Sequence, residues 1–209
     1  MAFGSGGWFR RKTLREHGLK PGARLLDVAV GTGLVAREAR ALVGDGGMVV
    51  GLDASFGMLE VARARLALPL VQGRAEALPF PDGCFDFVTI GYALRHMEEL
   101  GLTFGEFLRV LRPGGTLLIL EIARPETRFA RGFAALWLGR AVPALCRLLM
   151  PGRRSEELMR YYWDTISECV PAQTILAELS TAGFGRVEST LALGMFRQYS
   201  GVRAVEIRA

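Results

Sequence analysis

Two acids and a pair of glycines have the spacing of a nucleotide-binding site. Asp27 lies inside an apolar run that ends at Gly31-Thr32-Gly33, and Asp53 ends a second apolar run twenty residues after Gly33. Glycine lets the backbone approach a ligand closely, and the first amides of the following helix are free to meet an electron-rich group. A carboxylate in the place of Asp53 suits two ribose hydroxyls. The pattern therefore predicts a nucleotide-type cofactor.

Asp27 helps to choose between the cofactors that such a site could hold. Gly31-x-Gly33-x-x-Ala36 also fits the dinucleotide fingerprint, so a nicotinamide or flavin enzyme is one alternative. We expect the Asp27 carboxylate to point at the cradle, where it would attract the sulfonium and ammonium groups of S-adenosyl-L-methionine and repel a pyrophosphate. An ordinary strand, turn and helix with no ligand is the remaining interpretation.

The elements that must position these residues follow from the hydrophobic periodicity. Short apolar runs bounded by glycine or acid are typical of strands in a parallel sheet, and amphipathic stretches between them are typical of covering helices. The pattern thus predicts an α/β fold. We expect strands at 25–30, 49–53, 68–73, 85–91, 116–121, 187–193 and 202–208, and helices at 8–19, 36–42, 54–66, 103–111, 155–166 and 172–182.

The helix predicted at 54–66 places Met58, Leu59, Val61 and Ala62 on its inward side. For Met58 two interpretations stay open. It belongs to the core, or it lies under a bound adenine near the strand end.

The pattern changes after the fifth predicted strand. Residues 129–150 are apolar almost all round, interrupted by three arginines and a proline. Such a helix must be buried by something. Core packing is one interpretation, and a lid over an apolar ligand or an interfacial helix is the other. We expect residues 122–170 to cover the substrate within a single domain of residues 1–209.

Composition bounds the function further. A chain of 209 residues can bury a core of its own, and its three cysteines and two histidines form no metal-ligand cluster. We therefore expect no metal, reduced thiols and a cytoplasmic location. No signal peptide and no apolar stretch long enough to span a bilayer are visible. The net charge of +5 comes from scattered arginines, which argues against nucleic acid.

Five motifs in combination carry a family resemblance. They are Leu25–Val35, Gly51-Leu52-Asp53, Gly73–Asp82, Ala93-Leu94-Arg95-His96 and Arg109–Gly115. Together they resemble class I S-adenosylmethionine-dependent methyltransferases and, more narrowly, the ubiquinone/menaquinone biosynthesis C-methyltransferase family. The resemblance covers roughly residues 8 to 209. It implies a Rossmann-like, seven-stranded, mostly parallel sheet with helices on both faces and the last strand antiparallel.

The resemblance also implies roles for single residues. Those near the methionine part of the cofactor would be Asp27, Ala29, Gly31, Thr32, Gly33 and Gly91. Asp53 would take the ribose hydroxyls, and those near the adenine would be Ala54, Met58, Arg74 and Ala75. Arg95 matches an arginine placed near the reacting quinol.

This chain departs from the family pattern in three places. Arg74 replaces a small amide or acid, so that only its backbone role carries over. His96 stands where the family has asparagine. The chain begins after the family's N-terminal tyrosine-aspartate and methionine-asparagine pattern, so we expect a more open site, a different substrate or a truncated form.

The implied chemistry is methyl transfer to a ring carbon of a lipophilic, prenylated quinol. Arg95 is always cationic, so it would stabilise the developing phenolate rather than act as a base. His96 is the alternative as general base. The plainer interpretations are a surface cation paired with Glu98 or Glu99, and a capping or packing histidine.

Other functions stay open. They are methylation of another apolar small molecule, a nicotinamide oxidoreductase, and a non-catalytic protein that binds S-adenosyl-L-methionine. A lipophilic substrate also implies peripheral contact with the inner membrane face. A homodimer is compatible with the sequence and not required by it.

Overall fold

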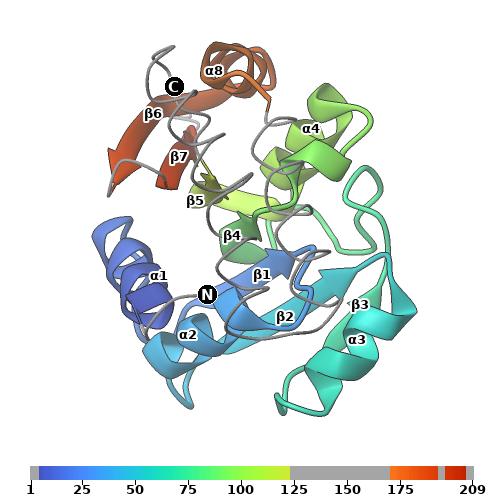
Figure 1. Ribbon diagram of the computed structural model, residues 1–209. Coiled ribbons are helices and arrows are strands. Elements are labelled where there is room, and N and C mark those ends of the chain that lie inside the picture. Colours follow the sequence, from blue (N-terminus) through green and yellow to red (C-terminus); the bar gives the residue numbers. More distant parts are fainter. Residues whose placement is uncertain (1–4, 123–169, 193–195, 206–209) are drawn as a thin grey trace, which may run out of the picture.

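Seven strands form one sheet in the computed structural model, which describes residues 5–122, 170–192 and 196–205 (Figure 1). The strand order is β3-β2-β1-β4-β5-β7-β6. The parallel part consists of β1 (Arg24–Val28), β2 (Met48–Asp53), β3 (Leu70–Gln72), β4 (Phe85–Gly91) and β5 (Leu111–Ile122). The antiparallel edge consists of β7 (Phe196–Arg203), which pairs with β5, and β6 (Phe184–Ala192), which pairs with β7.

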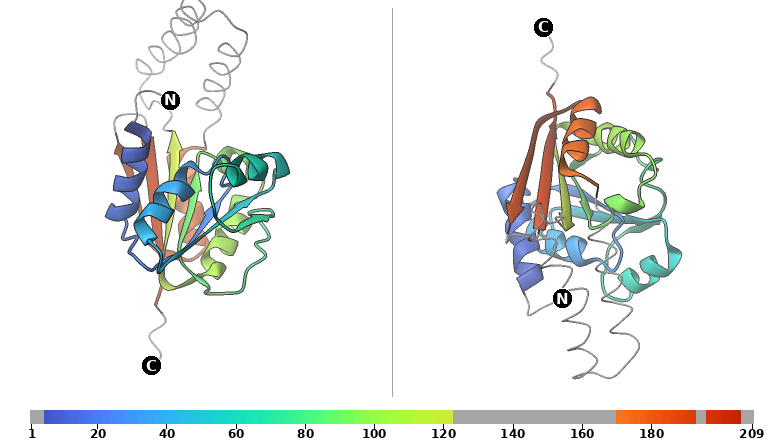
Figure 2. Two further views of the ribbon diagram at one scale, coloured as in Figure 1. Left: turned by 90° about the horizontal axis from the view of Figure 1, so that it is seen from below. Right: turned by 45° about the horizontal axis from the view of Figure 1, so that its top comes forward.

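Helices cover both faces of this sheet, so the central strands are apolar on both sides. On one face lie α1 (Ser5–Glu16), α2 (Leu34–Val43) and α3 (Phe56–Arg63). On the other lie α4 (Leu100–Val110) and α8 (Ala172–Thr181). The views in Figure 2 show α1 and α4 on opposite sides of the sheet. A short 3-10 helix, η2 (Leu94–His96), follows β4.

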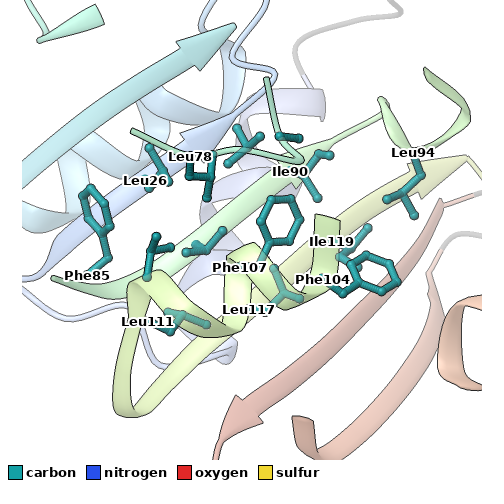
Figure 3. Packing of buried hydrophobic residues seen from close by; sticks show 14 of the residues in the cluster. Leu26, Leu78, Phe85, Ile90, Leu94, Phe104, Phe107, Leu111, Leu117 and Ile119 are labelled. Atoms are coloured by element: carbon teal, nitrogen blue, oxygen red, sulfur yellow. The ribbon is translucent and has the colours of Figure 1, made fainter. Parts of the chain in front are cut away.

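The two faces have separate cores because side chains alternate along each strand. On β5, Leu117 and Ile119 pack with the α4 side, whereas Leu118 and Leu120 pack with the α2 side. Figure 3 shows the rings of α4 directed at β4 and β5. This double cover holds the strand ends in fixed positions.

The predicted fold class and strand order along the chain are confirmed, with differences at the ends of elements. The strand predicted at 116–121 begins earlier, at Leu111, and Arg112–Gly115 form a bulge inside it, because β4 pairs with Leu111 and then with Thr116. The last strand begins at Phe196, six residues before the position predicted at 202. The helices predicted at 129–150 and 155–166 lie outside the described residues.

Helix α3 faces differently from the prediction. Leu59 and Ala62 are buried as expected, but Met58 is 46% exposed and Val61 is 38% exposed. The helix starts after Ser55, whose hydroxyl accepts from the Met58 amide, and of its residues only Leu59 and Ala62 are buried. Met58 is therefore not a core residue.

The α4 core provides a stability prediction. Phe107 is fully buried, with its ring centroid 6.2 Å from that of Phe104. We expect Phe107→Ala to lower the free energy of unfolding by about 3–5 kcal/mol, because burial is lost and a cavity remains. Urea denaturation followed by circular dichroism measures the change. The control is Leu102→Ala on the same helix, 61% exposed, which should change stability by less than about 0.5 kcal/mol.

Candidate functional site

A cleft of about 760 Å³ lies at the carboxyl ends of the parallel strands. Its walls come from the turns after β1, β2, β3 and β4, on both sides of the point where the crossover connections diverge, between β1 and β4. In open α/β sheets this is the place where ligands bind. The lining residues include Ala29, Gly31, Asp53, Ala54, Ser55, Met58, Gly73, Arg74, Ala75, Glu76, Gly91, Tyr92, Arg95, His96 and Glu98.

The glycine turn connects β1 to α2. Gly31 has φ 53° and Gly33 has φ 80°, the left-handed region that favours glycine. A Cβ on Gly33 would overlap a methyl group of Leu66, so the start of α2 packs closely against the segment that follows α3. Gly31 lines the cleft, whereas Thr32 and Gly33 do not. The turn therefore brings Gly31 into the wall of the cleft.

Asp53 ends β2 and faces the same cleft. Its Oδ2 accepts from the Gly31 amide at 2.8 Å, and its Oδ1 accepts from the Ser55 amide at 2.9 Å. A carboxylate oxygen has two lone-pair sites, so each can still accept from a ligand hydroxyl. The predicted pairing of glycine turn and acid is thus a direct contact in the structure.

Asp27 does not point into the cleft, contrary to our expectation. Its side chain lies on the α2 face of β1 and is 1% exposed. The Ala36 amide donates to Oδ2 at 2.9 Å, and the Thr89 hydroxyl donates to Oδ1 at 2.7 Å. Burial raises the pKa of Asp27 to about 7, although both hydrogen bonds lower it. Asp27 therefore fixes the start of α2 behind the glycine turn.

Two cleft residues have backbone conformations that are rare for residues other than glycine. Ala29 has φ 52° and Tyr92 has φ 60°, and they follow β1 and β4, which are neighbours in the sheet. Backbone hydrogen bonds hold both turns: Val30 donates to the Leu52 carbonyl, and Tyr92 donates to the Leu120 carbonyl. Such strain costs about 1–3 kcal/mol and is common at ligand sites.

The β2 and β3 end of the cleft contains the residues predicted to meet the adenine. Ala54, Met58 and Ala75 lie in its wall. Arg74 lines the cleft too, with Nε 3.4 Å from a Glu76 oxygen and Nη2 3.5 Å from a Glu98 oxygen. The Arg74 side chain is largely exposed in both pairs, so they contribute little to stability.

Arg95 and His96 lie on η2 at the other end of the cleft. Arg95 is half-buried and donates from Nη1 to the Tyr92 carbonyl at 2.6 Å. The positive charge of its guanidinium attracts the carboxylate of the buried Glu121. Glu121 also accepts hydrogen bonds from the Leu94 and Ile122 amides. Burial raises the pKa of Glu121, and those two bonds and the Arg95 charge lower it. Glu98, which we considered as a partner for Arg95, pairs with Arg74.

Three residues around the cleft were missed in the sequence. Tyr92 and Glu76 line it, and Arg10 of α1 acts on Tyr92, whose pKa is raised by burial and lowered by the charge of Arg10 and a hydrogen bond from it. Tyr92 directly follows Gly91, so its place at a strand end was a usable signal. The sequence gave no signal for Arg10, because it cannot be told apart from its neighbour Arg11, which is exposed.

Solved structures define the class of fold. A SAM-dependent methyltransferase from Aquifex aeolicus superposes with a TM-score of 0.70 at 19% identity, over 93% of this chain and 89% of that one. Phosphoethanolamine N-methyltransferase 2 from Haemonchus contortus superposes with a TM-score of 0.67 at 18% identity, over 94% of this chain and 53% of that one. The fold is that of the Rossmann-like methyltransferases.

The sequence gives the family. The model of the ubiE/COQ5 methyltransferase family matches residues 1–203. The ubiquinone/menaquinone biosynthesis C-methyltransferases UbiE of Shewanella sediminis and Shewanella woodyi are 36% and 34% identical over 197 residues, which are 91% of this chain and 77% of each relative. The chain belongs to the ubiE/COQ5 methyltransferase family. The predicted family, the enzyme class and S-adenosyl-L-methionine as cofactor are confirmed.

The residues present fit this cofactor. The Asp53 carboxylate is exposed to the cleft, Gly31 places backbone without a Cβ beside it, and the cleft is long enough to reach from β3 to β4. A Cβ on Gly91 would stand 3.1 Å from Val35, so the glycine also keeps this wall compact. Among the described residues, no cluster suited to a metal ion and no helix able to cross a bilayer is found.

Asp27 generates a prediction on pH. The folded protein holds the Asp27 proton more tightly than the unfolded chain, whose carboxyl has the ordinary pKa of 3.8. The stability from the neutral acid is therefore full below that value and is lost as the pH rises to about 7. Asp27→Asn keeps a neutral polar group, so its stability relative to the native protein should rise over this window, by on the order of 4 kcal/mol.

Chemical denaturation at intervals between pH 4 and pH 8 measures this difference. Asp45→Asn, which removes a fully exposed carboxylate, is the control. Identical dependence of stability on pH for the native protein and Asp27→Asn would contradict a raised pKa for Asp27 in the folded protein.

Proposed function

We propose that this enzyme transfers the methyl group of S-adenosyl-L-methionine to a ring carbon of a lipophilic, prenylated quinol. The observation that carries the proposal is the presence of Arg95 in the same cleft as Gly31 and Asp53. One end of that cleft suits a nucleoside, and the other offers a fixed cation to an oxygen that gains negative charge. The curated relatives, named ubiquinone/menaquinone biosynthesis C-methyltransferases, support the same substrate class.

The cofactor supplies a methyl group activated by attachment to a sulfonium. Displacement then depends mainly on holding the attacking carbon about 3 Å away and in line, which is a matter of proximity and orientation. In our proposal Asp53 accepts from the ribose hydroxyls, while Ala54, Met58 and Ala75 border the adenine. These contacts fix one reactant relative to the sheet.

The quinol ring carbon becomes a strong nucleophile when its hydroxyl proton leaves. We assign to Arg95 the stabilisation of the resulting oxyanion, because a guanidinium donates hydrogen bonds and stays charged. Its bond to the Tyr92 carbonyl orients it. His96, exposed in the same wall, is the candidate for accepting the proton, directly or through water.

A prenyl tail places the substrate in lipid, so we also propose a peripheral contact with the membrane. Phe56 is 55% exposed on α3, two residues before Met58, which lines the cleft. This apolar surface beside the opening supports entry of the tail from a lipid surface.

The direct test is an assay with reduced prenylated benzoquinones and naphthoquinones, with product detection by mass spectrometry. The proposal expects a mass gain of one methyl group on the ring. Turnover of other apolar acceptors alone would favour the second candidate, a methyltransferase for another small molecule. Cofactor binding without turnover of any acceptor would support a non-catalytic role.

Asp53→Ala tests the cofactor site. We expect its affinity for S-adenosylhomocysteine to fall by about a factor of ten to a hundred or more, because hydrogen bonds from ribose hydroxyls to a charged acceptor are lost. Isothermal titration calorimetry measures the affinity. The control is Asp45→Ala, which removes an exposed acid that pairs with Arg40, outside the cleft. Unchanged affinity in Asp53→Ala would remove Asp53 from the site.

Arg95→Gln tests the oxyanion role. We expect kcat to fall by about a hundredfold to a thousandfold, because charge stabilisation in the transition state is lost. Affinity for S-adenosylhomocysteine should change by less than about threefold, since the contact is with the acceptor. Arg112→Gln is the matched control, because Arg112 lies near the amino end of β5, at the opposite end of the strands from the cleft. A kcat equal to that of the control would exclude Arg95 from catalysis.

A further inference from the structure

Arg10 is a buried cation that is not fully paired. It lies on α1, is 5% exposed, and among the described residues its Nε has no hydrogen-bond partner. Its neighbour Arg11 instead forms an ion pair with Glu38 at 2.9 Å. Burying a guanidinium is costly unless its charge is used. We therefore expect Arg10 to have a function beyond packing.

Arg10 acts on a side chain of the cleft. Burial raises the pKa of the phenol of Tyr92, which lines the wall after β4, and the charge of Arg10 and a hydrogen bond from it lower that pKa. Arg10 also acts electrostatically on Asp27, behind the glycine turn. The guanidinium thus lies behind the wall between the ends of β1 and β4, away from the adenine end at β2 and β3.

The chemistry of this pair sets the direction of its hydrogen bonds. Arginine only donates, so the Tyr92 oxygen must accept from Arg10. A phenol has a single proton, and that proton is then left to donate to another acceptor. The left-handed backbone at Tyr92 is held by the bond from its amide to the Leu120 carbonyl, which fixes the main chain from which the ring extends. The pair presents a polarised donor to an oxyanion.

We propose that Tyr92, oriented by Arg10, binds the α-carboxylate of the amino-acid part of S-adenosyl-L-methionine. This inference depends on the assigned cofactor. With Asp53 at the ribose, the amino-acid part extends from β2 toward β1 and β4, where Tyr92 stands. Tyr92 is the binding residue, and Arg10 is a positioning residue that also supplies the positive charge.

The test compares two ligands that differ at this end. S-adenosylhomocysteine has the carboxylate, whereas 5′-methylthioadenosine has the same nucleoside and thioether without the amino-acid group. Tyr92→Phe removes only the hydroxyl, so it retains the packing of the ring. We expect Tyr92→Phe and Arg10→Met to bind S-adenosylhomocysteine about tenfold to a hundredfold more weakly, and to bind 5′-methylthioadenosine within about threefold of the native protein.

Arg15→Met is the matched control, because it removes an exposed arginine from the same helix. Equal losses for both ligands would assign Arg10 a structural role and overturn the proposal. Unchanged affinities in Tyr92→Phe would overturn it too, and a fall in kcat alone would instead place this donor at the quinol oxygen. If the native protein bound neither ligand, the cofactor assignment itself would fail, which separates the two hypotheses.

Discussion

The hydrogen bond from the Gly31 amide to the Asp53 carboxylate is the contact on which the shape of the site depends. It joins the turn after β1 to the end of β2, 22 positions apart in sequence. The second carboxylate oxygen accepts from Ser55, the residue that caps α3. One side chain therefore sets the relative positions of two loops and one helix. Because the same carboxylate faces the cleft, the group that shapes the cradle is also the group offered to the ligand.

The sheet makes this arrangement possible by holding strand ends rigidly. Strands β1 and β4 are buried on both faces, so strain in the turns that follow them can be sustained. Ala29 and Tyr92, with their left-handed backbones, stand side by side at these ends. The strained turns bring cleft-facing groups from separate strands into one wall. The bulge at Arg112–Gly115 lies at the opposite end of the sheet, where it leaves the site undisturbed.

Buried ionisable side chains support the cleft from both faces of the sheet. Asp27 and Glu121 accept from backbone amides, and Arg10 binds Tyr92. Each of these groups is buried, so its polar atoms are costly to leave unpaired and its geometry is well defined. Asp27 holds the start of α2, Glu121 holds the η2 turn that carries Arg95, and Arg10 acts on the Tyr92 side chain. The groups proposed to act on ligands are thus supported by groups that do not touch them.

The sequence by itself determined the fold class, the succession of strands and helices, and the pairing of a glycine turn with Asp53, because periodicity and turn residues are local properties. Through a motif, it also indicated that Arg95 belongs to the site, and Arg95 lies in the wall of the cleft. It was wrong about the direction of Asp27 and the burial of Met58, since both depend on how a helix start meets its neighbours. Only the tertiary structure decided that Arg10, and not Arg11, is buried against Tyr92. The two arginines are equivalent along the chain, and they differ only in the face of α1 that packs on the sheet.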